Sequence, residues 1–412
     1  MSLVTMTAGA FAPELTVVLV AAGCVAVVFG LYLVVLSVAA HFYSDPVQRI
    51  VPTSRVVVLI PAHDERLLIS DCVSSLLNQT YPRALYRIAV IADNCTDDTA
   101  MIAGGAGADV VMTRRDPAAH GKGQALRWAM DQILHEEHSP DAVIVVDADT
   151  IASPEMIEAL VRRLEAGADA VQGEYLLSGD GSSRSELRAL AFRLVNSVRP
   201  AGRTALGGSA QLVGNGMLLS RNLLLANPWS AFTSTEDLEY SLNLRMQHVR
   251  IMFAADAKLR SPTAPNARVA AAQQLRWEGG RAYLARRWIG RLAAAALRGS
   301  EPSLMEAAFE LAIPPLGFLA AASLVGLGCE GAFVVGGVLP AWTLVPWLVA
   351  LVSLPAYVLI GLSATPVPPA AYRVLLHAPL FIAAKPLSAY RVLRFRANTW
   401  VRTARGPRPN QE

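Results

Sequence analysis

The chain contains the run Ala142-Val143-Ile144-Val145-Val146-Asp147-Ala148-Asp149, in which an apolar segment ends in two carboxylates. The apolar residues predict a fully buried strand, and the two acids stand directly beyond its end. Hard divalent cations prefer oxygen ligands, so we interpret Asp147 and Asp149 as candidate ligands for Mg²⁺ or Mn²⁺, which would in turn hold a diphosphate. The alternative is that the two acids belong to a helix-start signal leading into residues 153–155.

The surrounding residues, 50–265, alternate short apolar runs with amphipathic stretches. The apolar runs predict strands at 56–60, 88–92, 110–112 and 143–146, and the stretches between them predict helices at 67–78, 97–103 and 124–134. This order indicates an α/β domain with a mostly parallel central sheet that is covered by helices on both faces. Ligands bind such sheets beyond the carboxyl ends of the strands, where Asp147 and Asp149 stand.

Membrane helices are predicted at both ends of the chain. Hydrophobic residues make up 53% and charged residues 17% of the sequence, which is too apolar for an ordinary cytosolic enzyme. Residues 15–40 carry no charge and exceed the roughly 20 residues that a transmembrane helix needs. We prefer this interpretation to a signal peptide, because residues 1–14 contain no Lys or Arg and the apolar run is too long for a signal.

A transmembrane helical hairpin is predicted at residues 308–364, where Glu330 interrupts two long uncharged runs. Pro340, Pro346 and Pro355 are compatible with membrane helices, because neighbouring groups can satisfy the freed backbone. Residues 370–387 are apolar but contain Arg373 and other charges. We therefore interpret 368–412 as an interfacial or re-entrant segment followed by a basic cytoplasmic tail.

Basic residues flank the predicted spans. They are Arg49 and Arg55 after the first span, five arginines between 281 and 298, and Arg391, Arg394, Arg396, Arg402, Arg405 and Arg408 in the tail. Because Lys and Arg accumulate in cytoplasmic flanks, we expect a non-cytoplasmic segment 1–14, a cytoplasmic domain 50–265 and amphipathic interface helices at 270–300, all integral to the cell (inner, cytoplasmic) membrane. This clustering and the net charge of only +3 favour membrane lipids, not nucleic acid, as the partner of the basic residues.

Two further motifs follow the acid pair: Thr235-Glu236-Asp237, and Gln273-Gln274-Leu275-Arg276-Trp277. In this order the three motifs resemble the family 2 glycosyltransferases, and among them the membrane-anchored bacterial cellulose, hyaluronan and poly-N-acetylglucosamine synthases. The resemblance covers roughly residues 50–300. It implies the GT-A fold, inversion at the transferred sugar, a divalent metal, and a nucleotide-diphosphate sugar as donor, with a UDP-sugar favoured.

The resemblance assigns the nucleotide end of the site to two strand ends. Pro61, His63 and Glu65 follow the first predicted strand, in the loop that lines the nucleoside pocket in the family. Glu65 would accept from a ribose hydroxyl or simply start the next helix, where the helix dipole favours acids. Asp93 matches the family's uracil-recognising acid, although Asp93-Asn94-Cys95-Thr96 is also a good turn sequence.

The resemblance also assigns the diphosphate end. Lys122 matches a basic residue of the family and precedes a predicted helix, whose N-terminus adds positive potential for a phosphate. By the same resemblance, Asp149 coordinates the metal directly and Asp147 lies near the ribose.

The resemblance makes Asp237 the base that takes the proton of the acceptor hydroxyl, with Glu236 as its supporting neighbour; the alternative is that both acids only start a helix. It implies an acceptor-side loop at Gly214, Asn215 and Gly216, for which a simple turn is the alternative.

The last motif is the most specific of the three. In the family Gln273, Gln274, Arg276 and Trp277 would cap the donor, with Arg276 near the diphosphate and Trp277 beneath the acceptor sugar. An interfacial amphipathic helix is a second account of this segment, and both accounts can hold at once. The continuation Glu278-Gly279-Gly280-Arg281 departs from the cellulose and hyaluronan synthases, and this speaks against processive polymer synthesis.

The sequence therefore predicts a membrane-bound glycosyltransferase that acts on a hydroxyl of a glycan or lipid-linked acceptor, in extracellular polysaccharide or cell-envelope glycan synthesis. The alternatives are a polyprenyl-phosphate monosaccharide synthase and a catalytically silent nucleotide-sugar-binding subunit of an export complex. Three predicted spans are few for a polymer conduit, so secretion of a polymer would require a homo-oligomer or an export partner.

Overall fold

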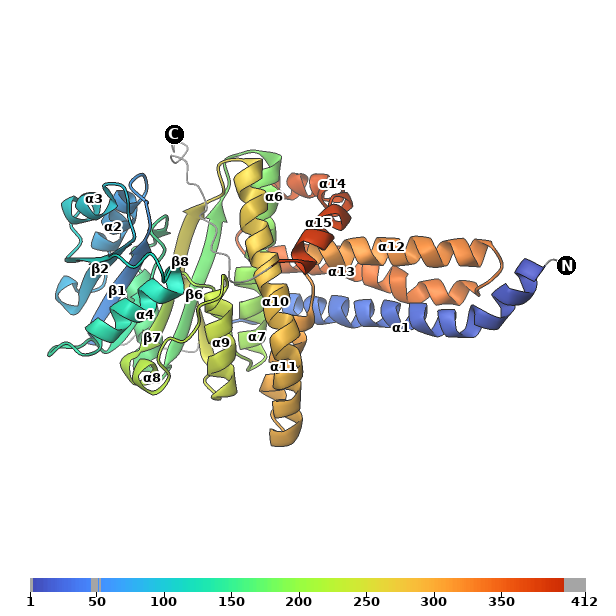
Figure 1. Ribbon diagram of the computed structural model, residues 1–412, viewed down its shortest axis with the longest axis horizontal. Coiled ribbons are helices and arrows are strands. Elements are labelled where there is room, and N and C mark those ends of the chain that lie inside the picture. The colour runs from blue at the N-terminus through green and yellow to red at the C-terminus, as the bar shows by residue number, and fades with distance from the viewer. Residues whose placement is uncertain (1–2, 46–50, 52, 396–412) are drawn as a thin grey trace.

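A computed structural model describes residues 3–45, 51 and 53–395 of the chain. An α/β domain stands at one end, and three long helices form an arm at the other (Figure 1). Two further helices, α10 (Ala267–Gly299) and α11 (Pro302–Ala312), lie across the base of the arm. The molecule thus has an α/β domain, a junction formed by α10 and α11, and an arm.

The domain is built on an eight-stranded sheet in the order β3-β2-β1-β4-β7-β6-β8-β5. Its strands are β1 (Val56–Ala62), β2 (Tyr86–Asp93), β3 (Val110–Arg114), β4 (Ala142–Val145), β5 (Ile151–Ala152), β6 (Ala170–Ser178), β7 (Met217–Ser220) and β8 (Ile251–Pro262). Strands β1 to β4 pair in parallel, and β7 runs antiparallel between β4 and β6. Because β6 and β8 are again parallel, the carboxyl ends of six strands meet at one edge of the sheet.

Helices cover both faces of this sheet. One face packs against α2 (Ile69–Leu77), α3 (Thr99–Gly105) and α5 (Met156–Glu165), and the other against α4 (Lys122–Ile133), α7 (Arg199–Ala205), α8 (Arg221–Ala226) and α9 (Glu236–Met246). In β1, Val57 and Leu59 enter one core while Val58 and Ile60 enter the other. Side chains alternate along a strand, so each strand contributes to both cores. Because both faces of the sheet are buried, both sets of side chains are apolar, and the strands appear in the sequence as continuous apolar runs.

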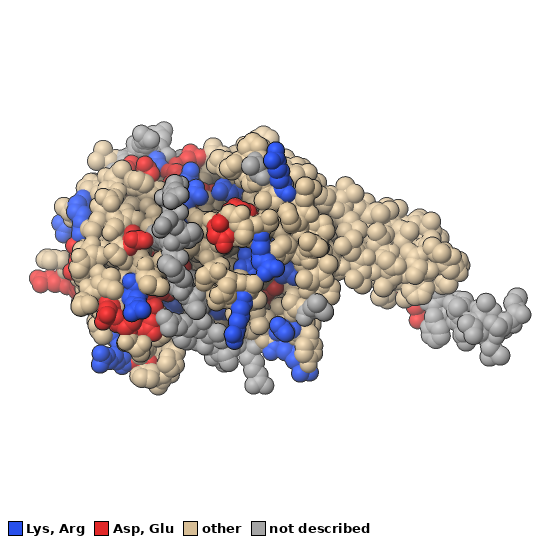
Figure 2. All heavy atoms as spheres, turned by 90° about the horizontal axis from the view of Figure 1, so that it is seen from above, with Lys and Arg blue, Asp and Glu red and all other residues tan. Residues whose placement is uncertain are grey.

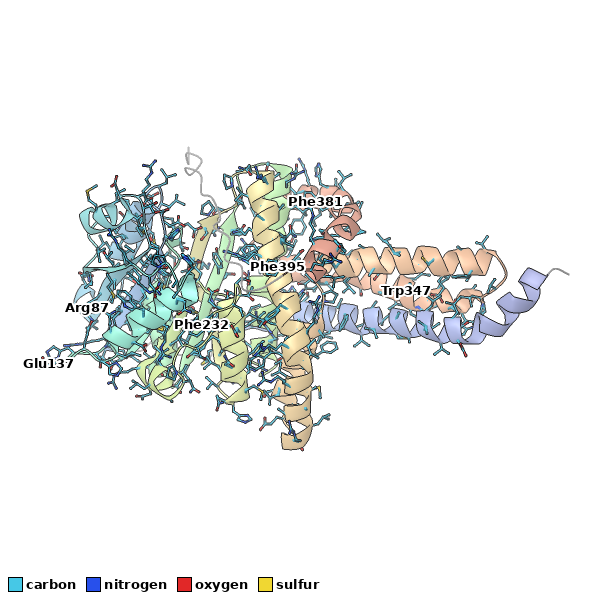
Figure 3. All side chains as sticks on the ribbon, in the orientation of Figure 1. Arg87, Glu137, Phe232, Trp347, Phe381 and Phe395 are labelled. Carbon is cyan, nitrogen blue, oxygen red and sulfur yellow. The ribbon has the colours of Figure 1, made fainter. Side chains whose placement is uncertain are left out.

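The arm consists of α1 (Leu3–Ala40), α12 (Leu316–Val335) and α13 (Val345–Ser363). By length and composition, three stretches could cross a membrane: Glu14–Ala40, Leu316–Val335 and Ala341–Ser363. In Figure 2 the arm is almost free of charged side chains, whereas Lys, Arg, Asp and Glu gather on the domain and the junction. Inside the arm (Figure 3), the indole N–H of Trp347 donates to one oxygen of the buried Glu330 carboxyl at 2.5 Å, and a carboxyl at such a position is costly to leave unpaired.

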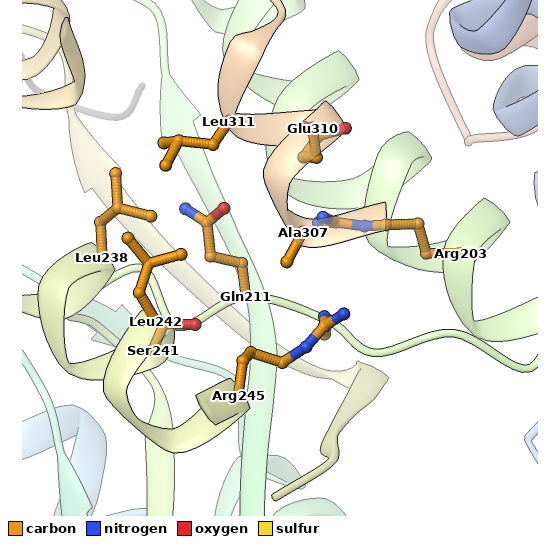
Figure 4. A pocket seen from close by; sticks show the side chains of 10 residues that line it. Arg203, Gln211, Leu238, Ser241, Leu242, Arg245, Ala307, Glu310 and Leu311 are labelled. Carbon is orange, nitrogen blue, oxygen red and sulfur yellow. The ribbon is translucent and has the colours of Figure 1, made fainter. Parts of the chain in front are cut away.

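The junction carries buried ion pairs. Arg199 of α7 lies 3.2 Å from Glu310 of α11, and Arg245 of α9 lies 3.0 Å from Glu306. The hydroxyl of Tyr32 on α1 also donates to Glu306 at 2.9 Å. A cavity between these helices is lined by Arg203, Gln211, Leu238, Ser241, Arg245 and Glu310, among others (Figure 4). Helix α11 therefore joins the domain to the arm through charged contacts.

The chain ends in a segment of short helices: η4 (Pro369–His377), α14 (Ala378–Ala383) and α15 (Lys385–Leu393). Each is shorter than a bilayer-spanning helix, as the interfacial or re-entrant interpretation of this segment requires. Residues 396–412, which hold most of the predicted basic tail, lie outside the described residues, as do residues 1–2 and Arg49.

The predicted fold class is confirmed, while several boundaries differ. Residues 308–312, which we assigned to the hairpin, belong to α11, because Glu310 pairs with the domain and the first hairpin helix begins only at Leu316. Residues 3–14 are helical and continuous with the span in α1, and their non-cytoplasmic placement stays a prediction. Helix α2 begins at Ile69, and the backbone oxygen of Glu65 accepts from the N–H groups of Leu68 and Ile69, so Glu65 lies in the turn that leads into this helix.

Candidate active site

The predicted site residues gather at the edge where the parallel strands end. His63 follows β1, Asp93 ends β2, and Asp147 follows β4. Gly214 precedes β7, which is antiparallel to β4 and therefore begins at this same edge. Segments that are far apart in the sequence thus contribute to one site.

At the nucleoside end, Asp93 is buried and lies 2.6 Å from the guanidinium of Arg114. A ring nitrogen of His63 lies 2.8 Å from the backbone oxygen of Asp93. Asn94 has a φ of 52°, and its side-chain amide donates to the backbone oxygen of Asp116 and accepts from the backbone N–H of the same residue. The turn anticipated at 93–96 is therefore present. Arg114 was missed by the sequence analysis, where it only followed a short predicted strand.

At the diphosphate end, a hydrogen-bond network holds the acid pair in place. The side chain of Asn215 accepts from the backbone N–H of Asp147 at 3.1 Å and donates to Thr150 at 2.8 Å. The hydroxyl of Ser261 on β8 donates to Asp149 at 3.3 Å and lies 2.9 Å from the Thr150 hydroxyl. Asn215 is fully buried, so its side chain supports the acid loop instead of facing an acceptor.

Lys122 lies between Asp147, in the loop after β4, and Asp237, the predicted base. Its ammonium lies 2.5 Å from Asp147 Oδ1 and 2.5 Å from the carbonyl oxygen of Gly214. Burial by itself lowers the pKa of Lys122, but the nearby charges of Asp147, Glu236 and Asp237 outweigh this effect and raise the pKa. The cation is therefore retained between the two groups of carboxylates.

Glu236 and Asp237 begin helix α9 and share this environment. Burial, together with the charge of Asp237, raises the pKa of Glu236 to about 7, against the opposing effect of Lys122. Burial also raises the pKa of Asp237, against the opposing effects of Lys122 and Arg276. A Cβ at Gly214 would lie 2.9 Å from Asp237 Oδ2, so only glycine leaves the carboxylate this space. Carboxyls with raised pKa values are suited to accept a proton near neutral pH.

Helix α10 covers this region with the last motif. Trp277 packs on Phe192 with ring centroids 5.8 Å apart, and Phe192 packs on Tyr175 of β6. Gln274 donates to Glu278 at 2.9 Å, while Gln273 is half-buried. The buried Nε of Arg276 has no hydrogen-bond partner within the described part of the chain. An unpaired buried donor beside the acids fits a site that awaits an anionic group.

The acid pair offers a suitable donor set for a divalent cation. Mg²⁺ is commonly held by one or two carboxylates together with substrate phosphates, and Asp147 and Asp149 provide such carboxylates. A second group, Asp64, Cys95 and Asp97, has ligand atoms within 4.8 Å of one another in the nucleoside loop. There, Asp64 already accepts from the backbone N–H of Thr96 at 2.6 Å and of Asp97 at 3.2 Å, which explains the cluster as a turn.

The chain is similar to known proteins in its domain. Residues 52–280, more than half of the chain, match the model described as "Glycosyltransferase like family 2". The chain belongs to this family. It is 27% identical to a beta-monoglucosyldiacylglycerol synthase of Nostoc sp. over 213 residues, which cover 50% of this chain and 43% of that protein. It is 25% identical to the probable glycosyltransferase YdaM of Bacillus subtilis over 247 residues, 56% of each chain. The matched part thus spans about half the length of these curated relatives.

A solved structure of the family's fold covers almost the whole chain. The mannosyltransferase PcManGT of Pyrobaculum calidifontis, in complex with GDP-Man and Mn²⁺, has a TM-score of 0.53 at 17% identity, covering 93% of this chain and 95% of that one. This likeness shows the GT-A-like fold, as predicted. The narrower likeness to cellulose, hyaluronan or poly-N-acetylglucosamine synthases is not confirmed, since the relatives above carry other names.

Proposed function

We propose that this family 2 protein transfers a sugar, with inversion, from a nucleotide-diphosphate sugar to a hydroxyl acceptor at a membrane surface. One observation carries the proposal: Lys122 pairs with Asp147 beyond β4, and both its ammonium and the Asp237 carboxylate lie beside Gly214. A candidate donor-binding acid and a candidate base therefore lie around one cation.

The donor would lie across the strand ends. The nucleoside would sit over His63, Glu65 and Asp93, with the Asp93 carboxylate oriented by Arg114. The diphosphate would face Lys122 and the unpaired Nε of Arg276. Mg²⁺ or Mn²⁺, held by Asp149 with Asp147 beside it, would neutralise charge on the leaving nucleotide.

The acceptor would be activated by Asp237. Inversion by direct displacement needs one base, which takes the hydroxyl proton while the bond to the nucleotide breaks. Asp237 stands at the start of α9 with space beside Gly214, and its raised pKa matches this task. Glu236, whose pKa is raised to about 7, would stay protonated more readily than an ordinary Glu, so the pair would not carry two full charges while buried. Like charges oppose each other's ionisation.

We favour a lipid or lipid-linked hydroxyl as the acceptor. Helix α10 passes from the site to the base of the apolar arm (Figure 1), so an acceptor anchored in the membrane would meet the site there. The name of the Nostoc relative, a glucosyldiacylglycerol synthase, supports this class of acceptor. A growing polysaccharide is the alternative product class.

The test uses the full chain in lipid nanodiscs with a panel of UDP- and GDP-sugars, with Mn²⁺, Mg²⁺ or a chelator. Nucleotide release together with labelled sugar in the lipid extract is expected, and both should stop with the chelator. Asp237→Asn should lose about 10²–10⁴-fold in kcat while still binding nucleotide, whereas the exposed control Asp131→Asn should not. Full transfer by Asp237→Asn would refute the base, and label found only in long polymer would refute the lipid acceptor.

A further inference from the structure

Residues 278–281, which follow the Gln-Gln-Leu-Arg-Trp motif, lie close to two different parts of the chain. A Cβ at Gly280 would lie 2.5 Å from the side chain of Thr235, the residue that precedes the two acids of α9. A Cβ at Gly279 would lie 2.4 Å from Phe395, at the end of the C-terminal segment. Helix α10 is therefore packed between the candidate base and that segment, and Figure 3 shows Phe395 against α10.

Glu278 makes a polar contact between α10 and the C-terminal segment. Its carboxylate lies 2.6 Å from the ammonium of Lys385, the first residue of α15, and both side chains are largely buried, at 11% and 15% exposed. Gln274 donates to the same carboxylate oxygen. The pair therefore ties the donor-capping motif to a segment that lies more than one hundred positions later in the chain.

Lys385 also touches the membrane arm. Its ammonium lies 4.7 Å from the ring centroid of Phe318, and its carbon chain lies beside Gly317, both at the beginning of α12. The C-terminal segment itself exposes apolar side chains, with Leu376 82% and Leu380 72% exposed. Such a segment suits the boundary of a bilayer, where amphipathic helices bury their apolar side chains.

We propose that Glu278 and Lys385 are positioning residues of the transfer site. By fixing α10 against α12 and α15, the pair sets the places of Arg276 and Trp277 over the donor and of Thr235 at the start of α9. The C-terminal segment thereby helps to fix the position of these residues at the site. This inference rests on the proposed function, and it concerns residues that touch neither donor nor acceptor.

Physical chemistry supports a strong and specific effect. Removing one partner of a largely buried ion pair leaves the other charge uncompensated, whereas removing both leaves none. Misplacing catalytic groups by about 1 Å can cost about 10²-fold in rate without loss of the remote binding contacts. The nucleoside contacts at Asp93 lie on the sheet and do not depend on α10.

The experiment compares Lys385→Met, Glu278→Gln, the double variant and Lys385→Arg with the parent in nanodiscs. Lys258→Met, at an exposed lysine of β8, is the matched control. We expect each single charge removal to lower kcat for sugar transfer about tenfold or more, with the dissociation constant for free nucleotide changed less than about twofold. The double variant should lose far less than the product of the two single losses, because it leaves no uncompensated charge, and Lys385→Arg should keep most of the activity.

Hydrogen exchange of residues 273–281 gives a readout that needs no turnover. Exchange should be faster in Lys385→Met than in the parent and unchanged in Lys258→Met. Unchanged kcat and unchanged exchange in both single variants would overturn the inference while the proposed function stands. If the parent transfers no sugar from any donor, the proposed function fails, and the exchange data alone then decide whether the pair positions α10.

Discussion

At the scale of single residues, the site depends on carboxylates that a cation holds in place. Asp93 is paired with Arg114, and Asp147 with Lys122. In both pairs the cation and the carboxylate belong to different segments of the chain. Both acids are therefore held where a nucleotide can meet them, and each cation should matter as much as the acid that it holds.

Arg114 offers a sharp test of the nucleoside end. Arg114→Met should weaken the binding of UDP about tenfold or more, because it leaves the buried Asp93 carboxylate without its counter-charge. Calorimetric titration with UDP measures this effect. The neighbouring exposed residue provides the control, Arg115→Met, which should bind UDP as the parent does. Equal loss in both variants would show a general effect of basic charge and not the support of Asp93.

The acid pair of α9 predicts a pH dependence. The base must be unprotonated, and the pKa of Glu236 is raised to about 7 while that of Asp237 is also raised. Activity should therefore fall as the pH drops, and the fall should occur at a pH above the usual range of an Asp carboxylate. The profile of kcat/KM against pH measures this limb. In Lys122→Met the limb should move to higher pH, because the cation that lowers the pKa of Asp237 is gone; a limb that stays in place would contradict this electrostatic link.

At the scale of elements, α11 is the connection between the arm and α9. Burial raises the pKa of Glu310, but Arg203, Arg199 and Arg281 outweigh this and lower it, so the carboxyl is a permanent anion among buried cations. This arrangement explains why an apolar, helical stretch that resembles the start of a membrane hairpin instead lies against the domain.

Removing this anion should therefore destabilise the junction. Glu310→Gln leaves the buried arginines without their counter-charge, and we expect a loss of about 3–5 kcal/mol, seen as a fall of several degrees in melting temperature. Thermal unfolding in detergent measures it, with the exposed Glu137→Gln as the control. An unchanged melting temperature would mean that water already compensates the arginines.

At the scale of the whole molecule, the arm and the domain imply an orientation. Basic residues flank the predicted spans, so we expect the domain on the cytoplasmic side, where nucleotide sugars are made. In a cysteine-free background, Glu137→Cys in the domain and Ala341→Cys between α12 and α13 should react with an impermeant thiol reagent from opposite sides of sealed vesicles. Labelling of both from one side would contradict the predicted topology.

Features that depend only on residues close together in the chain could be predicted from the sequence. Strand β4 and the acids after it were readable, because a buried strand is a continuous apolar run and its end is marked by the first charges. The start of α9 at Glu236 and the long apolar helices were readable for the same local reason.

The contacts between side chains from distant parts of the chain are visible only in the folded molecule. Asn215 supports a loop 68 positions away, Ser261 bonds an acid 112 positions away, and Lys385 pairs with a residue 107 positions away. These pairings follow from the register of the sheet and from the crossing of helices at the junction, neither of which leaves a periodic signal in the chain. Arg114 and Lys385 are ordinary basic residues in the sequence, and burial beside a carboxylate is what gives them a role.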